Sequence, residues 1–449
     1  MYQAYITTIK NLRPHPNADR LDLGECFGNT VCVGHGDFAE GDLVVYFPVD
    51  GQLSEEFCAQ HNLVRRKDDA GNNIGGYLDP AKRNVKAISL RGEKSDGLIM
   101  PLKSLEYTGV DIRGLEVGFC FTAVNGKEIC CKYIPRRPNC AAAGGANRTR
   151  KKKVPIAPLF AEHADTEQLA YNLSAFRPGD EIEITLKMHG TSQRTGYLPV
   201  LQGYTDKWYH KFYNWFWFKL LKSINSSANQ PIHGEPIYDY GYVSGTRRTV
   251  LEDFDGGYYG SNEFRETHSK QFEGKLWKGE TVYYEVVSFT NDGTPIMGKG
   301  KVPKEAQNLY GKEMVFHYGL EQGSDMYVYR MTMTNEDGCV VEYTPDFMRY
   351  RCEQIGVKTV PIFYKCILDP SIENPGEVVK QLAEQHYDGP DPIGKTHVRE
   401  GVVVRIINRP KFTAFKHKNF LFKQIAGIIT EQTADTNDIT ISDDILAEM

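Results

Sequence analysis

The sequence predicts an α+β protein in which a small all-β module precedes a larger domain built on antiparallel strands. Residues 1–125 contain short strand-like runs separated by Gly, Asp, Asn and Pro turns, and only residues 54–64 have a helical pattern. In residues 181–200, an alternating apolar strand runs into a glycine turn and a second short strand. Further strand-like runs follow at 282–289, 314–320, 327–333, 399–407 and 414–423. A length of 449 residues allows two or three domains.

Five or so strands within the first 125 residues favour a β-barrel of the OB type. The string PHPNADRLDLGE at 14–25 resembles the HPNADKL pattern of tRNA-binding OB domains, which implies this fold and a preference for RNA. We therefore expect an OB-like module at 1–125, a basic linker at 126–157, a larger domain at 158–424 and a short tail at 425–449.

Composition indicates a soluble globular protein, with 41% hydrophobic and 25% charged residues. The sequence has no run of about 18 apolar residues, and its first ten residues lack the layout of a signal peptide. We expect an intracellular, cytoplasmic protein without a membrane partner. Its ten cysteines contain no CxxC pair, which favours reduced thiols; a zinc site at Cys130, Cys131 and Cys140 is the alternative.

The net charge of −5 is small, but one segment is strongly basic. Residues 132–153 contain no acidic residue and these cations: Lys132, Arg136, Arg137, Arg148, Arg150, Lys151, Lys152 and Lys153. Such a segment is either a solvated linker between domains or a phosphate-binding strip whose contacts depend on salt.

Two segments of the larger domain have helical patterns besides a charged helix at 346–355. Residues 158–176 predict a helix that begins at 165 or 166. Residues 204–235 contain three of the four tryptophans, and their aromatic residues fall on every side of a helix. We expect this helix to pack on the core; an aromatic and basic platform that stacks single-stranded bases is the alternative.

The turn after the strand at 181–186 reads KxHGxS, with Lys187, His189, Gly190 and Ser192. A lysine at the point where a strand breaks into a glycine turn projects into a cleft. It can act as a nucleophile once deprotonated, but at an ordinary pKa of about 10.4 roughly one molecule in a thousand is neutral near pH 7. Neighbouring cations, a metal or burial must favour the neutral form. A solvent-exposed lysine in an ordinary turn is the alternative.

Other charged residues occur at strand positions where charge is costly. Glu285 lies in the middle of an apolar strand and Glu400 at the mouth of another, so each needs a partner or a cleft. Lys416 and Lys418 share one strand face, about 7 Å apart, which suggests a nearby anion; an exposed edge strand protected by lysines is the alternative. Arg247 lies in a glycine turn at 241–250.

Together these motifs resemble the covalent nucleotidyltransferase superfamily of ATP-dependent ligases and mRNA capping enzymes. The matching segments, in order, are KMHGTS at 187–192, YYEVV at 283–287 with VFHYGL at 315–320, EGVVVRI at 400–406 and KHK at 416–418. The histidine after the lysine resembles the RNA ligase branch, and a preceding OB module resembles the Deinococcus-type RNA ligases. The fold implied is an antiparallel-sheet, ATP-grasp-like adenylyltransferase domain.

The resemblance implies a role for each residue. Lys187 attacks the α-phosphorus of ATP, with His189, Gly190 and Arg247 close to the nucleotide. Glu285 binds the ribose and Tyr318 stacks on adenine. Glu400 holds Mg²⁺ or Mn²⁺, and Lys416 and Lys418 neutralise phosphate charge. The AMP then passes to an RNA 5′-phosphate, and a 3′-hydroxyl seals the strand.

Several alternatives stay open at this stage. Arg194 competes with Arg247 as the phosphate-binding arginine, and Phe316 competes with Tyr318 as the adenine-stacking residue. The expected partner is RNA in a nicked duplex or an RNA–DNA hybrid, bound by a monomer. The other functions are a DNA ligase, a capping guanylyltransferase that uses GTP, and a non-catalytic RNA-binding protein with a decayed ligase domain.

Overall fold

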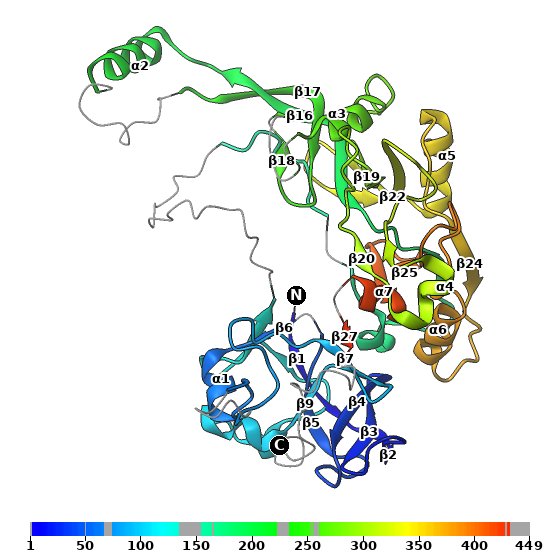
Figure 1. Cartoon of the computed structure of the whole chain (residues 1–449). Helices are drawn as coiled ribbons and strands as arrows, with labels where there is room; N and C mark the ends of the chain where they lie inside the picture. Colours follow the sequence, from blue (N-terminus) through cyan, green and yellow to red (C-terminus); the bar gives the residue numbers. More distant parts are fainter. Residues whose placement is uncertain are drawn as a thin grey trace.

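The computed structural model describes residues 2–49, 51–66, 74–133, 154–163, 166–221, 233–251, 253–254, 259, 261–426 and 429–431, with backbone only at 213, 216–221 and 429–431. Most of the basic segment at 132–153 and Cys140 lie outside the described residues. The described chain forms an N-terminal β module and a larger domain with two main sheets (Figure 1). No helix in these ranges is both long and apolar enough to cross a membrane.

The N-terminal module is built from short strands around two apolar clusters. Its first sheet has the order β10-β1-β5-β9, and β2-β3-β4 forms a second. Ser54 caps the expected short helix by accepting a hydrogen bond from the Phe57 amide. The elements are β1 Ala4–Thr8, β2 Lys10–Pro14, β3 Leu21–Cys26, β4 Asn29–Gly34, β5 Leu43–Phe47, β6 Gly51–Leu53, α1 Glu55–Gln60, β7 Ala87–Leu90, β8 Glu93–Asp96, β9 Leu98–Pro101, β10 Cys120–Phe121, β11 Ala123–Val124, β12 Lys127–Glu128 and β13 Cys130–Lys132, with 3₁₀ turns η1 Leu102–Thr108 and η2 Ile112–Gly114.

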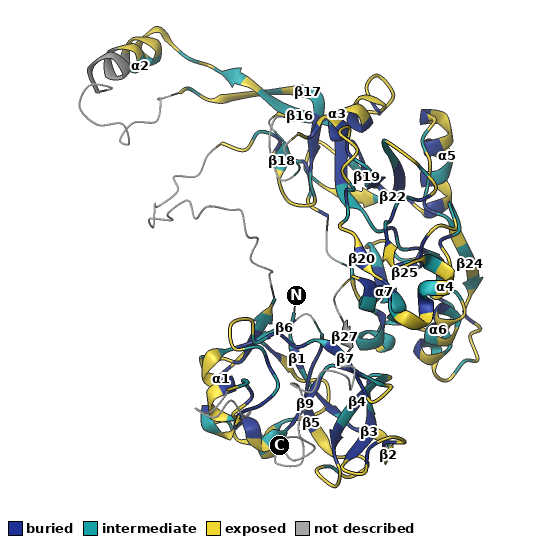
Figure 2. Cartoon of the chain, viewed as in Figure 1, coloured by how far each residue is buried: buried dark blue, intermediate teal, exposed yellow. Residues whose placement is uncertain are grey.

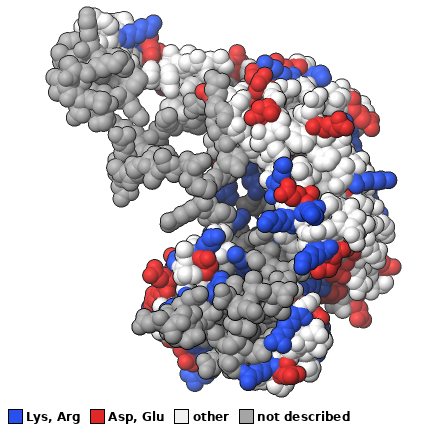
Figure 3. All heavy atoms as spheres, in the orientation of Figure 1, with Lys and Arg blue, Asp and Glu red and all other residues white. Residues whose placement is uncertain are grey.

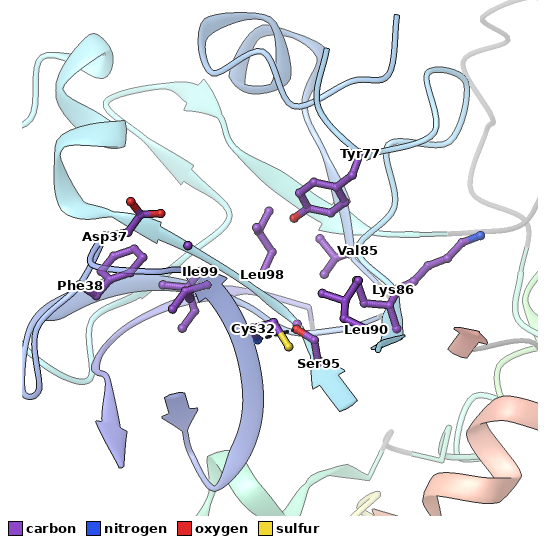
Figure 4. A pocket seen from close by; sticks show the side chains of 14 residues that line it. Cys32, Asp37, Phe38, Tyr77, Val85, Lys86, Leu90, Ser95, Leu98 and Ile99 are labelled. Atoms are coloured by element: carbon purple, nitrogen blue, oxygen red, sulfur yellow. Dashed lines mark hydrogen bonds between the residues drawn. The ribbon is translucent and has the colours of Figure 1, made fainter. Parts of the chain in front are cut away.

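This module has more strands than the five or so expected, because several of the additional ones, such as β6, β12 and β13, are only two or three residues long and such segments carry little alternating signal. Its interior contains a cavity of about 40 Å³, lined by residues such as Cys32, Val85 and Leu98. The Cys32 amide donates a hydrogen bond to Ser95 Oγ across its wall (Figure 4). That volume holds a few water molecules at most.

The larger domain contains a five-stranded sheet, β14-β26-β25-β15-β24, and a six-stranded sheet, β18-β17-β16-β19-β22-β23. Neighbouring strands in both are antiparallel except the short pair β14 and β26. The strands are β14 Glu167–Gln168, β15 Glu181–Leu186, β16 Thr191–Tyr204, β17 Pro236–Gly245, β18 Val250–Leu251, β19 Glu280–Ser288, β20 Gly300–Lys301, β21 Glu313–Met314, β22 Ser324–Thr334, β23 Val340–Glu342, β24 Ile362–Ile367, β25 Gly401–Ile406, β26 Thr413–Lys418 and β27 Ile429–Glu431.

Helices cover both sheets on their apolar faces (Figure 2). Residues of α3 and α5 pack with β19 and β22, and residues of α6 pack with β15 and β25. The helices are α2 Trp208–Leu221, α3 Glu263–Lys270, α4 Gln307–Tyr310, α5 Pro345–Ile355, α6 Pro375–Glu384 and α7 Phe420–Ile425, with 3₁₀ turns η3 Leu169–Tyr171, η4 Leu173–Ala175 and η5 Lys304–Ala306. The expected helix at 346–355 and strands at 282–289 and 327–333 are confirmed.

Three local expectations are wrong. The helix expected from 165 or 166 is replaced by β14 and two 3₁₀ turns, because 167–168 pair with the edge of β26. The strand expected at 314–320 ends at Met314, and Tyr318 has a positive φ of 48°, which no extended strand adopts. The strand expected at 414–423 ends at Lys418, because the Asn419 side chain caps α7 by accepting from the Phe422 amide.

The aromatic segment does form a helix, α2, but its described face does not pack on the core. Trp208 is 78% exposed, and Phe212 and Trp215 are each 57% exposed. The helix lies at the end of a long hairpin, β16 and β17, away from both sheets (Figure 1). Core packing is therefore wrong for these residues, since a helix at the tip of a hairpin has no core beside it.

The two parts of the chain touch through aromatic and charged side chains. Tyr171 of η3 stacks on Tyr5, with ring centroids 5.3 Å apart, and also meets Phe27 and Tyr46. Lys423 Nζ of α7 lies 3.3 Å from Asp96 Oδ2. The C-terminal strand β27 pairs with β7, so the end of the described chain returns to the N-terminal module.

Candidate active site

The Lys187 turn joins the two sheets of the larger domain. β15 ends at Leu186 in the five-stranded sheet, and β16 begins at Thr191 in the six-stranded sheet. The Lys187 amide donates to the carbonyl oxygen of Gly401 at 3.0 Å. A side chain at Gly190 would place its Cβ 2.3 Å from the carbonyl oxygen of Val286, so only glycine lets the turn lie this close to β19. Lys187 thus lies between the two sheets.

Glu400 connects two of the predicted lysines. Its carboxylate precedes β25, and its Oε1 lies 2.9 Å from Lys187 Nζ and 3.1 Å from Lys418 Nζ. The Glu400 side chain is 3% exposed. Burial alone would raise the pKa of this carboxyl, but the two ammonium groups outweigh burial and hold the pKa well below its usual range. Glu400 is therefore a buried carboxylate shared by two cations.

His189 lies on the other oxygen of the same carboxylate, with its Nδ1 3.6 Å from Glu400 Oε2. Burial lowers the pKa of His189, against the opposing effect of Glu400. The ring packs edge-to-face on Phe316 and Phe422, at 4.5 and 4.7 Å between centroids. Glu400 Oε2 is buried and has no hydrogen-bond partner among the described residues. One carboxylate oxygen in the site is thus left without a donor.

A cavity of about 90 Å³ lies beside Lys187 between the two sheets. Glu285, from the middle of β19, and Arg247, from the turn between β17 and β18, both line it. Burial raises the pKa of Glu285 to about 7; Glu400 adds to this, while Lys187, Arg247 and Arg265 oppose it. The two carboxylates near Lys187 therefore have opposite pKa shifts, because Glu400 contacts two cations directly and Glu285 does not.

The competing arginines have different surroundings. Arg194 is 1% exposed; its guanidinium lies 4.2 Å over the Phe160 ring and donates to the carbonyl oxygen of Ala161. Arg247 lines the cavity with Lys187 and Glu285. The structure therefore brings Arg247, and not Arg194, to the predicted site.

The competing aromatic residues are both buried, Tyr318 at 4% exposure and Phe316 at 3%. Tyr318 Oη accepts a hydrogen bond from the His189 amide at 2.6 Å, and its ring lies edge-to-face on His397 at 4.4 Å between centroids. Neither ring lines the cavity that Lys187 and Glu285 share. Both support the Lys187 turn, and the adenine-stacking role of Tyr318 stays a prediction.

Lys416 lies two residues before Lys418 on β26, and it lines a different space. This is an open cleft of about 730 Å³ between the N-terminal module and the larger domain, with Lys132 and Arg248 also on its walls. Lys and Arg side chains gather where the two parts face each other (Figure 3). The two lysines of KHK therefore have different surroundings: Lys418 contacts the buried Glu400 carboxylate, and Lys416 lines the cleft.

Sequence reasoning missed three residues that shape the site. Arg265 of α3 donates to the carbonyl oxygen of Ser192 at 3.2 Å and fixes the start of β16. Tyr329 of β22 lines the cavity, and its Oη lies 2.9 Å from Ser192 Oγ. His163, which precedes the larger domain's strands, also lines it. None of the three belongs to a local pattern, because only the packing of the sheets brings them here.

Clustered His, Cys, Asp and Glu side chains are the usual protein ligands of metal ions. No group of three His, Cys, Asp or Glu side chains that could hold a metal ion occurs within the described ranges. Cys130 and Cys131 are adjacent on β13, and burial raises the pKa of the Cys130 thiol to about 12. The zinc alternative includes Cys140, which is outside the described residues, and it stays untested.

The fold and site together define a class, an OB module joined to a two-sheet domain with a lysine–glutamate–lysine cluster. A family model described as an OB-fold domain matches residues 3–102. No curated protein sequence matches the chain. The N-terminal OB-type barrel expected from the sequence is thereby confirmed.

Particular solved structures share this fold over most of the chain. Naegleria gruberi RNA ligase with PPi is 17% identical, with a TM-score of 0.55 and coverage of 94% of this chain and 97% of that chain. An arginine-to-alanine mutant of the same ligase with ATP and Mn is 17% identical, with a TM-score of 0.54 and coverage of 94% and 98%. A glutamate-to-alanine mutant with AMP and Mn is 16% identical, with a TM-score of 0.52 and the same coverage. The likeness confirms the predicted fold, an OB barrel followed by an antiparallel-sheet domain.

Proposed function

We propose that this protein is an ATP-dependent RNA ligase that joins a 3′-hydroxyl to a 5′-phosphate through a lysyl-AMP intermediate on Lys187. The observation that carries the proposal is the meeting of Lys187, Lys418 and Glu400 beside a cavity that also holds Glu285 and Arg247. The solved ligase structures with the same fold bind ATP, AMP and Mn. An N-terminal OB module before the ligase domain supports placement with the Deinococcus-type RNA ligases.

The first step is nucleophilic attack. Lys187 Nζ forms a bond to the α-phosphorus of ATP, and the bond from that phosphorus to pyrophosphate breaks. Lys187 must leave its ion pair with Glu400 and give up a proton before its lone pair can attack. Lys418 Nζ lies 3.1 Å from the same carboxylate oxygen, so it still neutralises Glu400 after Lys187 has left. Its positive charge can also stabilise the negative charge on the phosphate.

The residues present fit a divalent cation. Glu400 Oε2 is a buried carboxylate oxygen with no hydrogen-bond donor among the described residues, His189 Nδ1 being 3.6 Å away, and carboxylate oxygens are the preferred ligands of Mg²⁺ and Mn²⁺. Glu400 would hold the ion. When bound, the ion would supply positive charge that neutralises the phosphates and favours the neutral amine.

The remaining residues position the nucleotide. Glu285 as a carboxylate accepts hydrogen bonds from the ribose hydroxyls, and Arg247 contacts phosphate. Tyr318 stacks on adenine once the turn that it supports through His189 has opened to the nucleotide. Gly190 keeps the backbone close enough to β19 for Lys187 and Glu285 to share one cavity.

The later steps need a polynucleotide. An oxygen of the RNA 5′-phosphate attacks the AMP phosphorus and releases Lys187; the 3′-hydroxyl then attacks the activated 5′-phosphate and expels AMP. The cleft with Lys132, Arg248 and Lys416 is adjacent to the cluster and suited to backbone phosphates. We infer that the duplex around a nick, in RNA or an RNA–DNA hybrid, lies along this cleft, bound by a monomer.

The test is incubation of the full-length protein with Mg²⁺ or Mn²⁺ and either ATP or GTP labelled at the α-phosphate, followed by a denaturing gel and peptide mass spectrometry. The expected result is an AMP adduct on Lys187. A GMP adduct would indicate capping chemistry instead. No adduct, from protein shown to be free of bound AMP, would point to a non-catalytic RNA-binding protein.

A further inference from the structure

The hairpin β16–β17 extends beyond the sheet to which it belongs. β16 pairs with β19 only from Thr191 to Gly196, whereas it pairs with β17 out to Tyr204. Past Gly196 the hairpin leaves β19, but Leu198 still packs on Ala157 and Phe160, and the Leu201 amide donates to the carbonyl oxygen of Ile156. Beyond Leu201 the two strands continue to Tyr204 and Pro236, and α2 lies at the tip (Figure 1).

The base of α2 is held firmly to the hairpin. Asp206 accepts a hydrogen bond from the Gly234 amide at 2.9 Å, and its other oxygen lies 3.0 Å from His233 Nδ1. The His233 ring stacks on Tyr204, with centroids 4.1 Å apart. The Asp206 carboxylate, just before the helix, thus makes its contacts within the tip of the hairpin.

One face of α2 presents aromatic rings to solvent. Trp208, Phe212 and Trp215 follow the i, i+4, i+7 spacing of one helical face, and their exposures are 78%, 57% and 57%. The Phe212 and Trp215 rings are 6.1 Å apart between centroids. Tyr209, beside this face, is 45% exposed. Four large aromatic side chains in solvent are a strong sign of a binding surface.

The charges around this face identify the chemistry of its partner. Lys207 and Lys211 are exposed, and Lys211, three residues after Trp208, lies on the aromatic face itself. No Asp or Glu occurs in residues 207–234. A helix that lies on a lipid surface separates its cations from its apolar face, and the part of α2 whose side chains are described does not. If two copies packed with these faces together, the lysines of one copy would lie against those of the other and repel them. Rings interleaved with cations match a strand of bases and phosphates.

We propose that α2 is a stacking platform for a single-stranded polynucleotide. Bases stack on Trp208, Phe212 and Trp215, and phosphates contact Lys207 and Lys211. This inference deepens the proposed ligase function: the hairpin holds a single-stranded stretch of the substrate away from the Lys187 site, while the ends to be joined lie between the domains.

The test measures binding of the full-length protein to a fluorescent 20-nucleotide oligouridylate, a DNA oligomer of the same length and a blunt duplex. Replacing both tryptophans by alanine, Trp208→Ala and Trp215→Ala, is expected to weaken oligouridylate binding about tenfold or more. The matched double change to phenylalanine keeps two rings and is expected to stay within about threefold of wild type. Leu309→Ala, at a residue that is 81% exposed elsewhere in the domain, is expected to have no effect.

Salt dependence tests the lysines separately. Lys207→Gln with Lys211→Gln is expected to reduce the slope of log affinity against log salt by about 1.4, since each phosphate contact on a single strand contributes about 0.7. An unchanged slope would overturn the phosphate contacts. Unchanged oligouridylate affinity in the alanine variant would overturn the platform. The platform would also be overturned if the tryptophans were needed for binding to anionic phosphatidylserine vesicles but not for binding to oligouridylate.

The outcome is separable from that of the ligase proposal. The first chemical step needs no polynucleotide, so the tryptophan variants are expected to form the AMP adduct at the wild-type rate. If the wild type forms no adduct but its oligouridylate binding depends on both tryptophans, the platform stands and the ligase proposal fails. If the adduct forms and binding ignores the tryptophans, the platform alone fails.

Discussion

Glu285 makes the stability of the larger domain depend on pH in a direction opposite to that of a carboxylate paired with cations, such as Glu400. Its pKa rises from an ordinary 4.5 to about 7 on folding, chiefly through burial. Between these values the folded state binds more protons than the unfolded state, so the free energy of unfolding falls as pH rises. Below pH 4.5 the contribution of Glu285 is fully present, and above pH 7 it is lost.

The magnitude follows from the size of the shift. A shift of one pKa unit corresponds to about 1.36 kcal/mol, so the whole window is worth about 3 kcal/mol, of which about 2.5 kcal/mol falls between pH 5 and pH 8. Glu285→Gln is neutral at every pH and removes this dependence. The mutant is therefore expected to gain about 2.5 kcal/mol relative to wild type over that range.

Urea unfolding followed by tryptophan fluorescence is the assay. All four tryptophans, at 208, 215, 217 and 277, lie in the larger domain, so the signal follows that domain. Glu321→Gln, at an exposed glutamate of the same domain, is the control and is expected to track wild type. A constant difference between Glu285→Gln and wild type from pH 5 to pH 8 would refute the assignment of Glu285 as a half-buried carboxyl that titrates near neutral pH.

Three further predictions concern the cluster and the domain contact. Lys187→Ala is expected to abolish the AMP adduct in a protein with wild-type circular dichroism; a remaining adduct would rule out Lys187 as the nucleophile. Glu400→Gln leaves two ammonium groups without their carboxylate and is expected to lower the free energy of unfolding by about 3–5 kcal/mol. Adding Lys418→Met removes one of these ammonium groups and is expected to restore part of that loss. Urea unfolding measures the stability of both variants. Tyr171→Ala removes the ring that contacts the OB module, so X-ray scattering is expected to show a larger radius of gyration. Nick sealing is expected to fall while the AMP adduct still forms. The control Tyr350→Ala, at an exposed ring, is expected to change neither the radius of gyration nor nick sealing.

The strands that carry the site could be predicted from local pattern. Ile182, Ile184 and Leu186 alternate because one face of β15 is buried, and the glycine at 190 marks the turn because no other residue fits beside Val286. Glu285 and Glu400 stood out because a carboxylate beside apolar neighbours needs a reason. The pairing of Glu400 with Lys187 and Lys418 is consistent with that reasoning.

Other features could not be read locally. The segment at 165–176 has helical spacing, yet it lies as a short strand and two 3₁₀ turns because the edge of β26 offers it backbone partners. Arg194 and Arg247 looked equivalent in the sequence, and only sheet packing placed Arg194 against Phe160 and Arg247 in the cavity. Arg265 had no signal at all, since its role comes from the contact of α3 with the start of β16.

By itself, the sequence determined the α+β class, the OB module and the residues that form the charged cluster, because alternation, turn chemistry and misplaced charge are local properties of the chain. The tertiary structure decided which of those charges meet. Burial with two cations lowers the pKa of Glu400, whereas burial without a direct cation raises that of Glu285. It also decided that the aromatic helix faces solvent, because a side chain is buried only where another part of the fold covers it.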